Sequence, residues 1–207
     1  MMKVYAKPFE DNKYTLAGKT IEPKVAQYFK ENYIGNYFLK TPTDVYGQDY
    51  FNKTYGDFFP EEKIFGGMWD FLITDKDNNI VTVIENKTAQ EKNRTKQWTN
   101  NGKNIVPANY ILQSALYAYL LKVNNILVIS SFLKPEDYVN PQLFIPDKNN
   151  TVLYNLKLDK DVPNFEDFYI KPAIDWYERH IVKGISPQFD LSNSIDKEIV
   201  DAMKGEM

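Results

Sequence analysis

Apolar side chains along this chain follow two spacings, and the spacing separates predicted helices from predicted strands. In the N-terminal part, Ile21, Val25, Ala26 and Phe29 have the spacing of one apolar helix face, with Thr20 as the expected cap. The same criterion, together with terminating residues, predicts three long helices. They are residues 20–32, 107–123 and 164–183.

Runs rich in β-branched and aromatic residues predict the strands. Residues 67–74 and 80–87 are two such runs, and the polar segment 75–79 between them favours a turn, so we expect a hairpin. Residues 126–133 are continuously apolar, as in a strand buried on both faces. Two further strands are expected at 142–146 and 151–158. The predicted fold class is α/β, a small mixed sheet flanked by helices.

Length and composition favour one domain. The chain has 207 residues, 43% of them hydrophobic and 15% aromatic, which is enough for one sizeable core and short for two. We therefore expect residues 1–190 to form the domain and residues 191–207 a tail with a short helix. No apolar run is long enough to cross a bilayer, and the start lacks the apolar stretch of a signal peptide. A soluble, cytoplasmic protein without a membrane partner is expected.

The absence of Cys and the presence of a single His exclude several kinds of site. Disulfides, thiolate zinc sites, iron–sulfur clusters and a cysteine nucleophile all need Cys, and one His cannot form a histidine metal site alone. Any metal must therefore be bound by oxygen ligands, which favours Mg²⁺ or Mn²⁺. The formal net charge of −3 means that nucleic-acid binding would need a local basic patch.

The strand predicted at 80–87 ends in a carboxylate and an ammonium group. Because strand side chains alternate between faces, Glu85 and Lys87 project the same way. Such charges are costly at the end of an apolar strand unless each has a partner, and Asp70 on the preceding strand is placed to face Glu85. The pattern Asp/Glu-x-Lys occurs four times in the chain, so only its position distinguishes this occurrence. A surface salt bridge at a strand end is the alternative.

These residue types suit the hydrolysis of a phosphodiester. Asp70 and Glu85, helped by the backbone carbonyl of Asn86, would hold Mg²⁺, which lowers the pKa of the attacking water. Lys87 would stabilise charge in the transition state or help to deprotonate the water. Octahedral Mg²⁺ keeps several waters, so two carboxylates are sufficient.

Three short motifs follow one another in the middle of the chain. They are Gly67-x-x-Asp70, Glu85-x-Lys87 and Gln113-x-x-x-Tyr117. In this order and approximate spacing they resemble the motif series of RecB-like PD-(D/E)xK nucleases, which implies a restriction-endonuclease-like fold. The resemblance also implies that Gln113 orients Lys87 or the substrate, and that Tyr117 contacts the DNA backbone or supports the site.

Two outer segments are similar to lambda-type, YqaJ-like phage recombination exonucleases. Gly18 and Glu22 match a glycine–glutamate helix, which implies that Glu22 is a third acidic metal ligand, and the segment 176–187 matches a closing helix. Asn86 stands where that family usually has an apolar residue, which would mark an edge or exposed strand. The resemblance implies a Mg²⁺-dependent exodeoxyribonuclease of phage or bacterial recombination or repair. It further implies DNA as substrate, and a homo-oligomer and a single-strand annealing or other recombination protein as partners.

A basic segment follows the catalytic strand. Lys92, Arg94, Lys96 and Trp98 are expected to hold DNA through phosphate contacts and base stacking. A solvated basic loop is the alternative. A second function class also stays open, a nuclease-fold binding protein with weak or no catalysis that acts as an accessory or inhibitor. A sequence pI of about 5.3 and the polar Asn86 favour it.

Overall fold

The structure is a computed structural model that describes residues 10–47, 56–186 and 188–204. By its internal contacts the chain divides into two compact units. One is Asp11–Phe165, and the other consists of Met1–Glu10 and Glu166–Met207. The first unit contains every residue that the sequence predicts for the site. No helix among the described residues is long and apolar enough to span a membrane.

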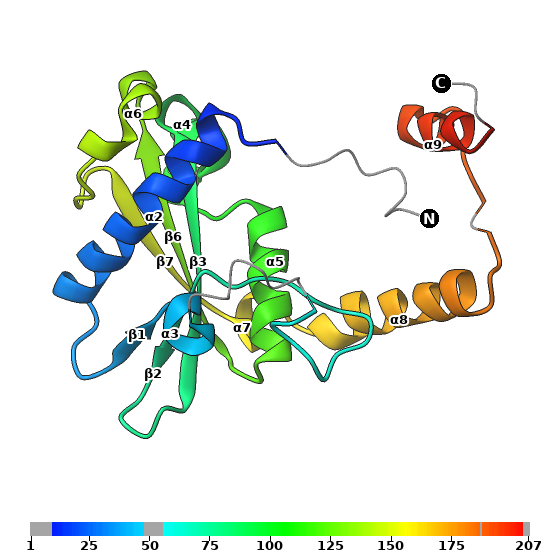
Figure 1. The fold of residues 1–207 in the computed structure, drawn as a ribbon, viewed down its shortest axis with the longest axis horizontal. Helices are drawn as coiled ribbons and strands as arrows, with labels where there is room; N and C mark the ends of the chain where they lie inside the picture. Colours follow the sequence, from blue (N-terminus) through cyan, green and yellow to red (C-terminus); the bar gives the residue numbers. More distant parts are fainter. Residues whose placement is uncertain (1–9, 48–55, 187, 205–207) are drawn as a thin grey trace. The chain divides into compact units, whose positions relative to one another are not determined.

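The first unit is built on a five-stranded mixed sheet (Figure 1). Its strands lie in the order β1, β2, β3, β6 and β7. Their bounds are Phe38–Lys40, Phe71–Thr74, Ile80–Gln90, Asn125–Leu133 and Thr151–Lys157. β3 and β6 run parallel, and the other neighbours pair antiparallel. The predicted α/β fold with a small mixed sheet flanked by helices is therefore confirmed.

β2 and β3 form the predicted hairpin, in which Phe71 pairs with Ile84. In the turn, the Asp75 carboxylate accepts hydrogen bonds of 2.9 Å from the backbone N–H groups of Asp77 and Asn79. This side chain satisfies turn donors that no strand partner reaches, which explains why the polar segment reverses the chain there.

Helix α2, Lys13–Asn32, begins earlier than the prediction. The expected cap, Thr20, lies inside the helix, where its hydroxyl donates to the Leu16 carbonyl. The N-cap is Asn12, whose side chain forms a reciprocal capping box with Thr15. The apolar spacing begins only after these first turns, so the spacing alone places the start too late.

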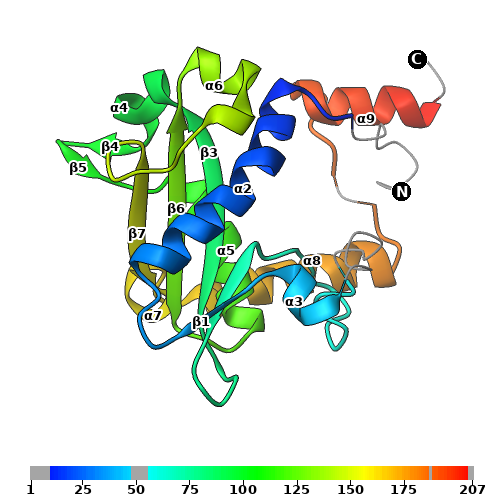
Figure 2. The same ribbon diagram turned by 60° about the vertical axis from the view of Figure 1, so that its left-hand side comes forward.

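Two helices cover the two faces of the sheet (Figures 1 and 2). α2 packs its buried side chains on Ile84, Leu127 and Ile129 of the sheet. α5, Ala108–Leu120, lies on the opposite face against β3 and β6. Strand alternation therefore sends the side chains that share the face of Ile84 towards α2, and their neighbours along β3 towards α5.

Segment 142–146 is not a strand, contrary to the prediction. Pro141–Leu143 forms a 3₁₀ turn, and an irregular loop leads from it to β7. Phe144 is buried against α2 in the main core, and its carbonyl accepts a hydrogen bond of 3.0 Å from Lys24 of that helix. Its apolar character thus serves a helix contact rather than sheet pairing.

Shorter elements connect the main ones. They are α3 (Pro42–Tyr46), η2 (Glu91–Asn93), α4 (Arg94–Gln97), β4 (Thr99–Asn100), β5 (Lys103–Asn104), α6 (Pro135–Val139) and α7 (Leu158–Asp161). β4 and β5 pair as a small separate sheet.

The second unit is helical in its described part. The helix predicted at 164–183 consists of a π-helical turn (η4, Glu166–Ile170), α8 (Lys171–Tyr177) and a second π-helical turn (η5, Glu178–Val182). Pro172 lies two residues after the first π-helical turn, and both proline and π-helical turns are usual causes of irregular helix geometry. Gly184 has a φ of +65°, a conformation that suits the end of a helix. α9 spans Ser194–Lys204.

Candidate active site

The candidate site lies where β2 separates from β3. Pairing between the two strands ends at Phe71, while β3 continues to Gln90. Asp70 stands immediately before β2, and its carboxylate accepts a hydrogen bond of 2.6 Å from the backbone N–H of Asn86. This bond fixes the Asp70 carboxylate beside the middle residue of the Glu85-x-Lys87 motif.

Glu85 and Lys87 project towards α5 and form an ion pair with each other. Glu85 is only 1% exposed, whereas the Lys87 side chain keeps 21% of its surface in solvent. The Lys87 ammonium nitrogen lies 5.1 Å from the ring centroid of Tyr110 on α5, within cation–π range. The predicted strand-end cation is therefore held between a buried carboxylate and an aromatic ring.

Burial and mutual repulsion perturb the carboxylates strongly. Burial, and then the charge of Asp70, raise the pKa of Glu85 to about 8. Burial also raises the pKa of Asp70 to about 6, although Lys87 opposes this. Burial lowers the pKa of Lys87, but the two carboxylates outweigh it, so this pKa is raised overall. The carboxylates gather more negative charge than one ammonium group offsets.

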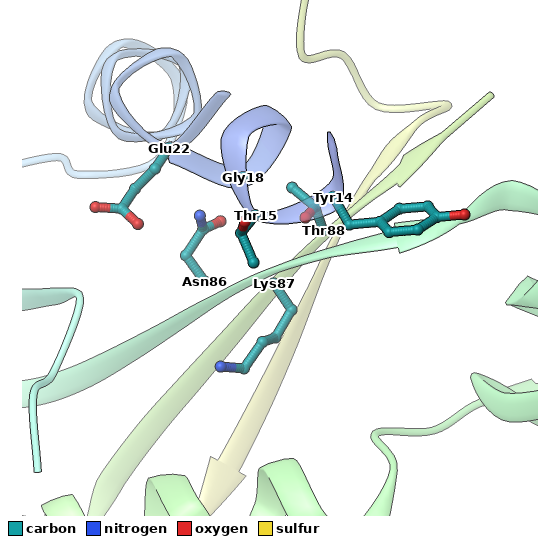
Figure 3. Close-up of a pocket in the computed structure, with 7 residues that line it drawn as sticks. All are labelled: Tyr14, Thr15, Gly18, Glu22, Asn86, Lys87 and Thr88. Atoms are coloured by element: carbon teal, nitrogen blue, oxygen red, sulfur yellow. The ribbon is translucent and has the colours of Figure 1, made fainter. Parts of the chain in front are cut away.

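A third carboxylate approaches from α2. Glu22 is partly buried and faces the cleft beside Asn86 and Lys87 (Figure 3). Burial, and then the nearby charge of Asp70, raise its pKa to about 7, while Lys87 lowers it. The structure thus brings the acidic residue of the upstream motif into the electrostatic field of the central ones.

Two polar atoms of the site are buried without a hydrogen-bond partner in the described part of the chain. They are Oε2 of Glu85 and Oδ1 of Asn86. Buried oxygen atoms are rarely left unpaired, because each then loses its hydration without gaining a hydrogen bond. A divalent cation would pair with this carboxylate oxygen and would offset the repulsion between the carboxylates.

The donor set fits a hard divalent ion. Asp70 and Glu85 supply carboxylates, and within a strand the N–H and C=O of one residue point to the same side, so the Asn86 carbonyl faces Asp70 as its N–H does. In the described residues no three His, Asp or Glu side chains are close enough to bind one ion by themselves. Waters would complete the coordination of Mg²⁺ or Mn²⁺.

Asn86 does not mark an edge or exposed strand, contrary to the expectation. β3 is the central strand of the sheet, and Asn86 is only 9% exposed. What makes this position special is that β3 loses its β2 neighbour there. The backbone of Asn86 is thereby freed to bond Asp70 instead of a strand.

The helix motif lies against the same site. On α5 the Gln113 amide donates a hydrogen bond of 3.1 Å to the Tyr117 hydroxyl, and Tyr117 is buried. A Cβ at Gly67 would overlap the Tyr117 ring, with Cζ at 2.9 Å and Oη at 3.0 Å. The glycine of the Gly67-x-x-Asp70 motif therefore admits the tyrosine of the Gln113-x-x-x-Tyr117 motif.

The basic segment is only partly available to DNA. Trp98 is 1% exposed and packs in an aromatic cluster, so the prediction that it stacks on bases is wrong. The Arg94 guanidinium donates to the Asn149 carbonyl at 2.8 Å and lies over the Phe132 ring, which gives it a structural role. Lys92 and Lys96 are exposed.

Several residues of the site were not found from the sequence. Tyr110 contacts Lys87, and its signal was available, because it precedes Gln113 by three positions and Tyr117 by seven on the same helix face. Tyr14, Thr15 and Thr88 line the cleft beyond Glu22. Nothing in their local sequence marks these three residues, because α2 and β3 meet only in the folded chain.

Comparison with known proteins shows similarity over the part of the chain that contains the candidate site. The model of the family described as YqaJ-like viral recombinase domain matches residues 1–120. The chain is 29% identical to MG373, an uncharacterized protein of Mycoplasma genitalium, with 93% of this chain and 76% of that protein covered. It is 25% identical to the MG373 homolog of Mycoplasma pneumoniae, with 91% and 74% covered.

A solved structure is also similar. The alkaline exonuclease LHK-Exo of Laribacter hongkongensis matches at a TM-score of 0.43 and 15% identity, with 85% of this chain and 78% of that chain covered. The family match is the stronger finding, because it spans more than half of the sequence, from the N-terminus to the end of α5. The chain therefore belongs to the family of YqaJ-like viral recombinase domains.

Proposed function

We propose that this protein is a metal-dependent deoxyribonuclease that hydrolyses DNA phosphodiesters. The observation that carries the proposal is the convergence of Asp70, Glu85 and Lys87 on the open end of β3. A second observation supports it: one buried oxygen of Glu85 has no hydrogen-bond partner in the described part of the chain. The alternative of a surface salt bridge at the strand end is disfavoured, because Glu85 is only 1% exposed.

Each residue has a role in the proposed reaction. Asp70, Glu85 and the Asn86 carbonyl would hold Mg²⁺ or Mn²⁺, with Glu22 as a further acidic group. The ion would supply Lewis acidity and lower the pKa of the attacking water. Lys87 is held as a cation by Glu85, and it would stabilise the negative charge that develops on the phosphate.

The residues of α5 would keep this geometry. Gln113 and Tyr117 are joined by a hydrogen bond, and the Tyr117 ring fills the space that Gly67 leaves open. In the proposal Gln113 orients Lys87 or the substrate, and the buried Tyr117 supports the site rather than reaching along the DNA backbone.

The proposed setting is recombination or repair in a phage or a bacterium, with exonuclease action. Membership of a viral recombinase family supports this setting. Endonuclease action is a close variant of the same chemistry. A homo-oligomer and a single-strand annealing or other recombination partner belong to the same proposal.

The alternative is a binding protein that has kept the fold without useful catalysis. The polar, buried Asn86 at the centre of the motif favours it. The enzyme is favoured by the Glu85–Lys87 ion pair and by the hydrogen bond that holds Asp70 at Asn86, between these two residues.

Linear and circular DNA, incubated with Mg²⁺, Mn²⁺ or EDTA, test the proposal. We expect loss of linear DNA with either metal and none with EDTA. Lys87→Ala should lower the rate by about 100-fold or more, because it removes the charge that faces the transition state. Lys63→Ala is the matched control, since Lys63 belongs to the same Asp/Glu-x-Lys pattern in an exposed loop.

Each outcome decides between the candidates. Equal rates for wild type and Lys87→Ala would trace the activity to a contaminant and remove the enzyme assignment. Cleavage of circular as well as linear DNA would replace the exonuclease by an endonuclease. No cleavage with either metal would favour the binding protein.

A further inference from the structure

A cleft of about 270 Å³ runs between α2 and β3, beside the carboxylates (Figure 3). Seven residues line it: Tyr14, Thr15, Gly18, Glu22, Asn86, Lys87 and Thr88. One end holds Glu22 of the candidate active site, and the other end extends along the first turns of α2. A group bound here would be adjacent to a phosphate held at the site.

The side chain of Asn86 is directed into this cleft. Figure 3 shows its amide turned towards α2, whereas Lys87 extends to the other side of β3. Asn86 is 9% exposed, and its Oδ1 has no hydrogen-bond partner in the described part of the chain. The nearby Thr15 hydroxyl cannot serve, because it already donates its hydrogen to the Asn12 carbonyl at 2.9 Å. A donor from outside the chain would satisfy this oxygen.

Gly18, in the second turn of α2, lines the cleft without a side chain and leaves space there. A Cβ at Gly18 would lie 3.5 Å from the Thr88 hydroxyl across the cleft. This is ordinary van der Waals contact, so an added methyl group fits the fold while it occupies part of the space. A longer side chain would close the cleft.

The charges in the cleft select a neutral ligand group. The Lys87 ammonium lies on the other side of β3, where it is paired with Glu85, and the carboxylate of Glu22 repels an approaching anion. The remaining polar side chains are the Asn86 amide and the hydroxyl groups of Tyr14, Thr15 and Thr88, none of which supplies a positive charge. A phosphate is therefore disfavoured there, whereas a sugar hydroxyl or a base N–H suits the unpaired amide oxygen.

We propose that the cleft between α2 and β3 binds the nucleoside part of a DNA nucleotide, and that the Asn86 side chain accepts a hydrogen bond from it. This inference rests on the proposed nuclease function, since the phosphate of the same nucleotide would lie at Asp70 and Glu85. Asn86 thus contributes twice, through its backbone beside Asp70 and through its amide in the cleft.

Fluorescence anisotropy with a short, dye-labelled thymidylate strand tests this in EDTA, where cleavage cannot interfere. Asn86→Leu keeps the side-chain size but removes the acceptor, and we expect its Kd to rise roughly 5- to 10-fold. Asn36→Leu, at an exposed position outside the cleft, is the matched control and should bind like the wild type. An unchanged Kd for Asn86→Leu would overturn the proposal, as would a wild type that does not bind the strand.

Gly18→Ala guards against a misfolded Asn86 variant. Alanine favours a helix interior more than glycine does, so the thermal midpoint should rise. The methyl group narrows the cleft, so Kd should still rise by about threefold or more. Tighter or unchanged binding by this more stable protein would count against the proposal.

The two proposals fail in different ways. If the wild type degrades DNA with Mg²⁺ but Asn86→Leu and Gly18→Ala bind the strand normally, the nuclease stands and the cleft assignment falls. If binding depends on both positions but no metal supports cleavage, the cleft assignment stands and the nuclease falls.

Discussion

At the scale of single residues, the carboxylate of Glu85 is the group through which the proposed metal ion would affect the stability of the fold. It is almost fully buried, close to Asp70, and only one of its oxygens is paired among the described residues. Without a divalent ion, the fold bears the cost of its charge, which is why its pKa is raised to about 8 from an ordinary value of 4.5. A cation at this position would relieve the same cost.

The pH dependence of stability follows from the sign of this shift. Between pH 4.5 and about 8 the folded protein binds a proton that the unfolded chain releases, so the unfolding free energy falls as pH rises. In EDTA we expect a loss on the order of 2–4 kcal/mol over this range, measured by urea denaturation. Glu85→Gln should flatten the profile and be more stable than the wild type at pH 8.

Adding Mg²⁺ should replace the proton and stabilise the wild type at pH 8 more than Glu85→Gln. The exposed Glu62→Gln serves as control and should keep the wild-type profile. A pH profile that is the same for wild type and Glu85→Gln would contradict the assignment of the raised pKa to this residue.

At the scale of elements, the loop before β2 and helix α5 depend on each other. The Tyr117 ring occupies the place where a side chain at position 67 would stand, so α5 can lie this close to the loop only because that residue is glycine. Asp70 lies three residues further along the same segment. Displacing the ring would therefore disturb both the helix and Asp70, the proposed metal ligand.

Gly67→Ala should destabilise the protein by about 1–3 kcal/mol, because the new methyl group forces the buried Tyr117 ring to move. Chemical denaturation measures this loss, and the rate of the proposed DNA cleavage should fall with it. Tyr117→Ala in the same chain removes the overlap, so the two changes together should cost less than their sum. Strict additivity would show that the glycine does not act through Tyr117.

At the scale of the whole molecule, the charge distribution limits how the proposed DNA substrate would be held. The net charge is −3, so attraction must come from local groups. Of the predicted basic segment, Lys92 and Lys96 are exposed, whereas Arg94 is bound to Asn149 and Trp98 is buried. We therefore assign the proposed phosphate contacts to the two lysines.

Replacing both Lys92 and Lys96 by Gln should weaken the salt dependence of binding. The negative slope of log K against log salt should become less steep by about 1.4, since each phosphate contact on a single strand contributes about 0.7. Binding of a thymidylate strand over a series of salt concentrations measures the slope. Gln at both Lys76 and Lys160, which are exposed elsewhere in the same unit, should leave it unchanged. Equal slopes for all three proteins would remove this segment from the interface.

The sequence by itself determined the local features of this protein. Strand alternation placed Glu85 and Lys87 on one face, helical spacing placed Gln113 beside Tyr117, and the polar turn at Asp75 set the hairpin. These features depend on neighbours within a few residues, so periodicity and turn chemistry are sufficient to predict them.

Only the tertiary structure decided which of these features meet. The end of β2 puts Asp70 against the backbone of Asn86, and α2 brings Glu22 and the cleft to β3. The burial of Trp98, and of Phe144 against α2 rather than in a strand, also follows from packing between distant segments. Such contacts depend on which apolar faces the whole chain buries together, and a local pattern does not contain that information.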